Sequence, residues 1–187
     1  MFITTLNCPF NTPFKKNYLM DGETITLLQD ITLTEDLTWN TEGDATFTLN
    51  LGEFKITNGN FSIKLKPGQR VNTDKTTSIS TFSADEGYAV KDAKDENGKY
   101  YYTVEEADYM YTNANGTVTY KLYKSSDLGS STGTYKLLKD FTATARISPG
   151  ITASNVTLDL NGHTLTSTAT DCAILLSRAG SSSSPKI

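Results

Sequence analysis

Three short segments of this 187-residue chain recur about 110 residues further on, in the same order and at similar spacing. The first pair shares the pattern Leu-Leu-polar-Asp-apolar-Thr. Chance similarity between threonine-rich strands explains one such pair easily, but three pairs in register poorly. An internal repeat limits the fold to architectures in which similar units follow one another. The three pairs are residues 27–32 with 137–142, 47–52 with 156–162, and 61–65 with 172–176.

Each copy contains short segments in which apolar and polar residues alternate, the pattern of a strand with one buried face. In the first copy these segments are residues 24–28, 45–51, 61–65 and 79–82, and they begin about 15 to 22 residues apart. A spacing of roughly 20 residues suits one coil of a solenoid, in which each coil covers the apolar side chains of the coil before it. We therefore predict an all-β solenoid with inserted hairpins. The alternative is an antiparallel β-sandwich, which also uses short strands separated by turns.

Two Asn-Gly pairs, Asn97-Gly98 and Asn115-Gly116, lie between alternating strands. This is the strongest short-range signal for a hairpin, because both residues accept positive φ. We expect two hairpins that link the first stack of strands to the second. The second copy stops short of where the first continues, so we expect the natural chain to run beyond residue 187. The expected organisation is a poorly structured leader or cap (1–17), a first repeat with its hairpin (18–108), and a hairpin with a truncated second repeat (109–187).

Composition supports an all-β fold and excludes several classes of function. The chain has 30 Thr, 10 Tyr and 8 Phe, residue types that fit a pleated surface. Lys and Arg total 17 against 21 Asp and Glu, without a basic stretch, which argues against a nucleic-acid partner. No apolar run approaches roughly 18 residues, so we expect no membrane insertion.

Two cysteines and one histidine argue against a zinc site, and we expect no metal or cofactor. Cys8 and Cys172 pair only if the leader folds back, and a buried free thiol is the simpler expectation.

Residues 155–165 read Asn-Val-Thr-Leu-Asp-Leu-Asn-Gly-His-Thr-Leu. This stretch resembles a coil of the right-handed parallel β-helix proteins of the pectate-lyase-like superfamily, and most of all the large surface proteins of gut bacteria. Residues 22–37 resemble their other recurrent coil, and residues 81–104 resemble a hairpin that follows such coils. The resemblance implies a right-handed parallel β-helix in an exported protein. The first copy departs from the pattern, because residues 50–53 are one residue shorter than residues 159–163, so the register of that turn does not follow from the match.

Seven of the ten tyrosines fall between residues 100 and 123. Exposed aromatic rings beside Asn and Asp can stack on sugars, which makes Tyr100, Tyr102, Tyr111 and Tyr120 candidate ligand-binding residues. The alternative is a small aromatic core, since aromatic cross-strand pairs stabilise hairpins.

The only histidine, His163, follows an Asn-Gly turn four residues after Asp159. A catalytic imidazole needs a second group that orients it, and Asp159 is the nearest candidate in the sequence. We also list His163 as a possible ligand-binding residue. The alternative is a turn residue on a solvated corner.

No motif of the superfamily's enzymes is present: there is no Asp-Asp pair, no Gly-His-Gly and no Arg-x-Lys. Residues 95–106 approach the spacing of a calcium loop, but Lys99 stands where an oxygen ligand is required. We therefore expect a non-catalytic structural and adhesive segment of an extracellular or cell-surface bacterial protein. Its expected partners are polysaccharides or host glycans, with self-association through open solenoid ends. The alternatives are a fragment of a polysaccharide lyase or hydrolase, and a structural subunit of a phage or fimbria.

Overall fold

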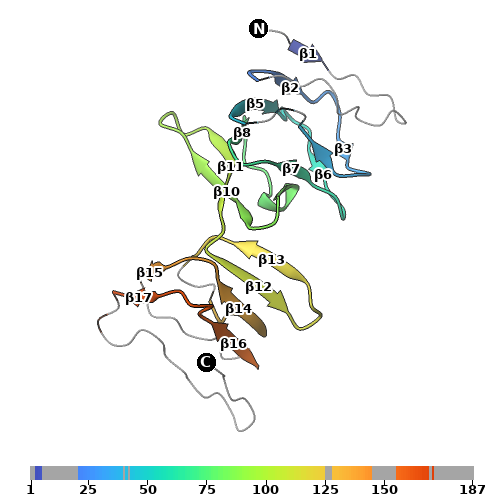
Figure 1. Ribbon diagram of the computed structural model, residues 1–187. Coiled ribbons are helices and arrows are strands. Elements are labelled where there is room, and N and C mark those ends of the chain that lie inside the picture. Colours follow the sequence, from blue (N-terminus) through green and yellow to red (C-terminus); the bar gives the residue numbers. More distant parts are fainter. Residues whose placement is uncertain are drawn as a thin grey trace. The chain divides into compact units, whose positions relative to one another are not determined.

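The computed structural model describes residues 3–5, 21–39, 41, 43–124, 128–144, 155–168 and 170. These residues form strands and turns, with one short 3₁₀ turn, η1 (Ile79–Thr81). The chain divides into two compact units, Met1–Glu105 and Glu106–Ile187. Within each unit parallel coils stack as in a β-solenoid, about five turns in all, which confirms the predicted parallel β-helix (Figure 1).

Unit 1 contains three sheets, and successive coils contribute strands to each of them. The largest sheet consists, in spatial order, of β1 (Ile3–Thr5), β2 (Thr24–Thr26), β5 (Ala45–Asn50), β8 (Gln69–Thr73), β11 (Tyr100–Glu106) and β10 (Tyr88–Lys94). The second sheet consists of β3 (Ile31–Thr32) and β6 (Ile56–Thr57), and the third of β4 (Leu37–Thr38), β7 (Ile63–Leu65) and β9 (Phe82–Ala84). Within the expected leader, β1 pairs in parallel with β2.

The coils of unit 1 are stacked in parallel and in register. Thr24 lies opposite Thr48, and Thr48 lies opposite Asn72, so the largest sheet advances by 24 residues per coil from β2 to β8, after a step of 21 residues from β1 to β2. This overturns the antiparallel sandwich and lengthens the expected coil of roughly 20 residues. The difference arises because one coil contains three strands. The predicted segments 45–51 and 61–65 belong to different sheets of the same coil, as β5 and β7.

The core of unit 1 is a set of stacked inward side chains. Burial alternates along β5 and β8, as expected for strands with one face toward a core. Phe47 is 1% exposed and its ring stacks on Trp39 with centroids 4.7 Å apart. Ile25 pairs with Leu49 on the next coil, and both are buried. Each coil therefore removes the apolar face of its neighbour from water, which is the main stabilising term of a solenoid.

The hairpin at the end of unit 1 covers the edge of the parallel sheet. Its turn closes where the Asp95 amide donates to the Lys99 carbonyl, at the predicted Asn-Gly position. The second strand, β11, pairs antiparallel with β8, with Tyr102 opposite Val71. Backbone groups of β8 that would otherwise form an exposed edge are thus satisfied within the unit. The sequence predicted this hairpin as a link between stacks, and the structure shows that it also belongs to the sheet.

Unit 2 begins with the second predicted hairpin and continues as parallel coils. Strand β12 pairs antiparallel with both β13 and β14, whereas β14 pairs in parallel with β16. Its core contains two tyrosines, Tyr109 and Tyr135, with Leu137 and Val156 packed against them. The elements are β12 (Tyr109–Asn113), β13 (Val118–Lys121), β14 (Gly133–Leu137), β15 (Phe141–Ala143), β16 (Val156–Asp159) and β17 (Leu165–Ser167). Strands β15 and β17 form a separate parallel pair. Cys8, Cys172 and the predicted segment 172–176 lie outside the described residues.

The internal repeat includes a corner turn that has the same length in both units. In unit 1 the Phe54 amide donates to the Leu51 carbonyl at 2.9 Å, and in unit 2 the His163 amide donates to the Leu160 carbonyl at 2.8 Å. Gly52 occupies the place of Asn161, and both have positive φ, 56° and 50°. The two turns are therefore equal in length. The one-residue deficit read from the sequence was wrong, because Gly52 replaces Asn161 and not Gly162.

Candidate functional site

The outward side chains of the largest sheet of unit 1 form a surface that we call the polar face. On β2, β5 and β8 every second side chain is buried, so the side chains between them point away from the core. On β11 the buried residues are Tyr102 and Val104, which places Tyr101 and Thr103 outward. The polar face consists of Thr24, Thr26, Thr46, Thr48, Asn50, Arg70, Asn72, Tyr101 and Thr103.

Strand register arranges the polar face in rows that run across the coils. One row crosses four strands and consists of Thr24, Thr48, Asn72 and Tyr101. Neighbouring strands lie about 4.8 Å apart, so hydroxyl and amide groups repeat at a fixed short spacing along such a row. Each side chain of such a row can both donate and accept hydrogen bonds. The row therefore offers repeated donors and acceptors to a long ligand that lies across the coils.

Arg70 is the charged centre of the polar face. It lies in a second row, between Thr46 on β5 and Thr103 on β11. Its guanidinium carbon lies 3.8 Å from the centroid of the Tyr101 ring, and its Nε donates to Asn72 Oδ1 at 2.7 Å. The ring and the amide together hold the guanidinium plane in one orientation, through a cation–π contact and a hydrogen bond.

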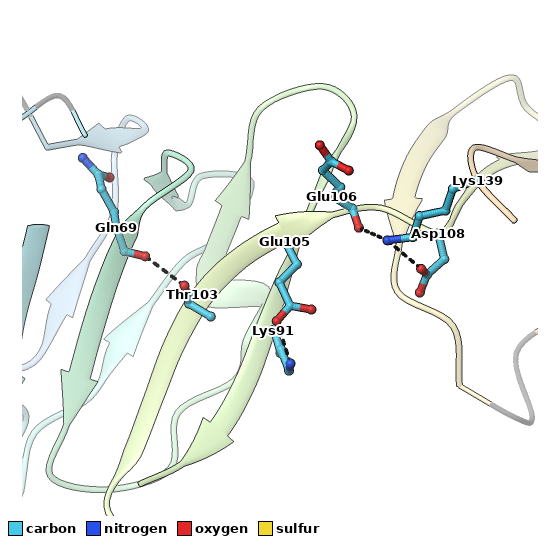
Figure 2. A network of polar contacts seen from close by, with 7 residues as sticks. All are labelled: Gln69, Lys91, Thr103, Glu105, Glu106, Asp108 and Lys139. Atoms are coloured by element: carbon cyan, nitrogen blue, oxygen red, sulfur yellow. Dashed lines mark hydrogen bonds and ion pairs between the residues drawn. The ribbon is translucent and has the colours of Figure 1, made fainter. Parts of the chain in front are cut away.

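The rim of the polar face at the hairpin is fixed by polar contacts (Figure 2). Thr103 Oγ1 donates to the Gln69 carbonyl at 3.1 Å and so ties β11 to β8. Further along, Lys91 Nζ and Glu105 Oε1 form an ion pair at 2.6 Å. The hydrogen bond to Glu105 raises the pKa of Lys91 above its ordinary value. This rim carries paired charges of both signs, so its local net charge is small.

Figure 2 also shows how a lysine anchors the first hairpin of unit 2. Lys139 Nζ lies 2.9 Å from Asp108 Oδ1 and donates to the Glu106 carbonyl at 3.0 Å. The second carboxylate oxygen of Asp108 accepts the Tyr123 amide at 2.6 Å. Lys139 and Asp108 are therefore structural residues that hold the hairpin of unit 2 in place.

Two of the tyrosines expected to bind a ligand, Tyr100 and Tyr102, lie on the core side of β11. Tyr102 is 1% exposed, and its ring stacks on Phe82 with centroids 4.4 Å apart. Its hydroxyl donates to the Thr77 carbonyl at 2.7 Å, while burial raises the pKa of Tyr102. A ring enclosed in this way presents no face to a sugar. Tyr100 is half-buried, and the hydroxyl of Thr76 followed by the ammonium of Lys94 lowers its pKa.

The other two tyrosines, Tyr111 and Tyr120, lie on opposite faces of the unit 2 hairpin. Tyr111 packs against the core, 4.8 Å from the ring of Tyr135, and its hydroxyl donates to the Thr132 carbonyl at 2.7 Å. Tyr120 lies opposite Met110, one residue away from the inward position, and is half-buried. The structure therefore does not join Tyr111 and Tyr120 into one aromatic platform.

His163 lies at the corner of unit 2, and its carboxylate neighbour is Asp140. Nδ1 of His163 is 3.4 Å from Asp140 Oδ1, and the same oxygen accepts the Thr164 amide at 2.7 Å. Asp159, which the sequence suggested as the orienting group, instead accepts the Asn161 amide. In unit 1 the position of His163 is occupied by Phe54, in the turn of equal length. The corner thus folds without an imidazole.

Sequence reasoning missed Arg70 and Tyr101 as a pair. Residues 69–73 are polar except for Val71, so the buried polar residues Gln69 and Thr73 concealed the strand. Gln69 is accommodated inside because its amide donates to the Thr41 carbonyl and accepts the Lys66 amide. A signal was nevertheless present: the alternation around Tyr102 already placed Tyr101 on the opposite face of β11.

Within the described residues, three or more His, Cys, Asp or Glu side chains do not gather into a possible metal site. In the same part of the chain, no helix has the length and apolar character needed to cross a membrane. Comparison with family models, curated proteins and solved structures returned no match for this chain.

Proposed function

We propose that this chain is a non-catalytic, adhesive segment of a bacterial cell-surface protein, and that its polar face binds polysaccharide. The supporting observation is the row Thr24, Thr48, Asn72 and Tyr101, which repeats hydrogen-bonding groups across successive coils. Polysaccharides are themselves repetitive and rich in hydroxyl groups. A ligand that lies along the row makes many weak contacts at once, and their combined effect exceeds any single contact.

The extracellular location and the bacterial surface context are part of the same proposal. They are motivated by the resemblance of residues 155–165 and 22–37 to coils of surface β-helix proteins. A stacked solenoid suits this role physically, because each coil contacts only its neighbours and the array can be lengthened without a new core. The binding surface grows with the number of coils.

The proposal is tested with the full chain and a panel of neutral polysaccharides, mucin and bacterial cell-wall preparations. Binding is measured by affinity electrophoresis and by calorimetry. The variants Thr48→Val and Asn72→Ala remove one hydroxyl and one amide from the row, and each is expected to weaken binding by about 3- to 10-fold. Thr119→Val, on an exposed position of unit 2, is the matched control and is expected to bind like the unsubstituted chain.

Two results would contradict the proposal. One is the absence of binding to every member of the panel at high concentration. The other is binding that Thr48→Val and Asn72→Ala leave unchanged, which would place the ligand elsewhere.

A further inference from the structure

Arg70 has guanidinium N–H donors that are not used in holding the described part of the fold together. Of the five N–H donors of a guanidinium, the structure uses the one on Nε, which donates to Asn72. Within the described residues, Arg70 forms no ion pair with a carboxylate. The two terminal nitrogens are thus available on a half-buried side chain whose plane is already oriented by Tyr101.

Two carboxylates near the polar face have partners other than Arg70. Asp21 Oδ1 accepts the amide of Thr46, which neighbours Arg70 in the same row, at 2.7 Å. Glu105, at the rim, is paired with Lys91. The outward positions of β2, β5 and β8 are otherwise Thr and Asn, so the single positive charge of Arg70 is not neutralised by the face itself.

We propose that Arg70 is the subsite for an anionic substituent, a carboxylate or a sulfate, on the saccharide that the polar face binds. This inference rests on the proposed function and specifies its ligand. The terminal nitrogens of arginine form a planar fork that pairs with two oxygens of one anionic group. Thr46 and Thr103 flank the fork and can hydrogen-bond the neighbouring sugar hydroxyls.

A purely structural role for Arg70 makes a different prediction. Arg70 on β8 and Tyr101 on β11 are diagonal neighbours, and such a pair can stabilise the junction of two strands. If stabilisation is its whole role, replacing Arg70 changes the unfolding curve and leaves ligand selectivity intact. If the subsite exists, selectivity for anionic ligands disappears while the folded chain persists.

The test uses the full chain with dextran, carboxymethyl dextran and dextran sulfate of matched size. We expect the charged dextrans to bind about 10-fold more tightly than dextran, with an advantage that shrinks as salt is added. Arg70→Gln is expected to lower binding of the charged dextrans to the level of dextran. Arg70→Lys keeps the charge but loses the fork, and is expected to retain part of the advantage. Lys99→Gln removes the same charge from an exposed position of unit 1 and is expected to retain all of it.

The outcomes separate this inference from the proposed function. Equal loss in Lys99→Gln and Arg70→Gln, or full retention of selectivity in a folded Arg70→Gln, overturns the subsite. So does failure of the chain to bind either charged dextran. None of these results bears on binding of the neutral polysaccharides of the panel, which tests the polar face by itself. The stronger of the two charged ligands identifies the group as carboxylate or sulfate, and equal binding shows that the fork accepts both.

Discussion

Asp30 and Lys55 are joined across neighbouring coils: the Lys55 amide donates to Asp30 Oδ1 at 3.0 Å. Unit 2 repeats the contact, with the Thr164 amide donating to Asp140 Oδ1 at 2.7 Å. Both aspartates belong to the recurring Leu-Leu-polar-Asp-apolar-Thr pattern. The repeated aspartate is therefore explained by a backbone donor at each corner that has no strand partner and is satisfied by a carboxylate.

Removing this carboxylate is expected to destabilise unit 1. Asp30→Ala should lower the free energy of unfolding by about 1–2 kcal/mol, because the Lys55 amide loses its partner. Asp30→Asn keeps a neutral oxygen acceptor and should cost less. The measurement is urea unfolding followed by the fluorescence of Trp39, the only tryptophan of the chain. Glu35→Ala, at an exposed position, is the control, and equal stability of Asp30→Ala and Glu35→Ala would refute this reading of the corner.

Two phenylalanines allow a matched test of the core. Phe47 is 1% exposed, whereas Phe61 is 38% exposed. Phe47→Ala is expected to cost about 3–5 kcal/mol through lost burial and the cavity it leaves. Phe61→Ala should cost about 1 kcal/mol or less. Urea unfolding compares the two variants, and losses of similar size would show that the stacked core is not arranged as described.

Gly133 marks the place where the unit 2 hairpin meets its first coil. Its φ is +145°, and a Cβ there would lie 2.3 Å from the Thr112 carbonyl oxygen. Gly133→Ala should therefore disrupt the pairing of β12 with β14, with a loss above about 2 kcal/mol. Gly116→Ala, where a Cβ meets open space, is expected to cost about 1 kcal/mol from its positive φ alone. Hydrogen exchange of the Thr112 and Thr134 amides, which lie opposite each other in the β12–β14 register, measures the difference, and unchanged protection in Gly133→Ala would contradict the observed contact.

The buried hydroxyl of Tyr102 predicts a loss of stability at alkaline pH. Burial raises its pKa above the ordinary tyrosine value of 10.0, so above about pH 10 the unfolded chain releases a proton that the folded chain retains. Fewer protons bound in the unfolded state means that the free energy of unfolding falls as pH rises. Tyr102→Phe should remove this component. In Tyr100→Phe the decline should persist or steepen, because the pKa of Tyr100 is shifted in the opposite direction.

Urea unfolding, followed by Trp39 fluorescence, is measured at several pH values between about 8 and 11. This pH range includes the ordinary tyrosine pKa of about 10. The pKa of Lys91 is also raised, by the hydrogen bond to Glu105, so any decline that Lys91 adds has the same sign and is the same in both variants. A Tyr102→Phe variant that declines as steeply as the unsubstituted chain would show that this hydroxyl is not buried.

The Asn-Gly turns predicted both hairpins, and strand periodicity favoured a solenoid over a sandwich, while the parallel β-helix followed from the resemblance of residues 155–165 and 22–37. Long strands such as β5 alternate over six residues, so their inward face is legible in the sequence. The two-residue strands β3 and β6 are too short to show alternation, and the coil length was underestimated as a result. Their position is determined by pairing of Ile31 with Ile56, a contact between residues 25 positions apart.

The candidate site was predicted less well than the fold. The candidate ligand-binding residues were predicted from the number of tyrosines between residues 100 and 123. The role of each tyrosine depends instead on which face of its strand it occupies. Tyr102 became a core residue because β11 pairs with β8 and places it opposite Val71. The same pairing brings Arg70 of β8 next to Tyr101 of β11. The sequence of the hairpin or of β8 taken alone does not predict this contact. A site formed by two strands that run in opposite directions requires the register before its residues can be identified.

Successive coils of unit 1 stack in parallel, and backbone nuclear Overhauser effects measure this pairing in solution. We expect contacts between the amide and Hα protons of Thr24 and Thr48, and of Thr48 and Asn72, in the pattern of parallel strands, together with side-chain contacts between Ile25 and Leu49. Close Hα–Hα contacts between β2 and β5, the mark of antiparallel pairing, would contradict the solenoid and with it the polar face.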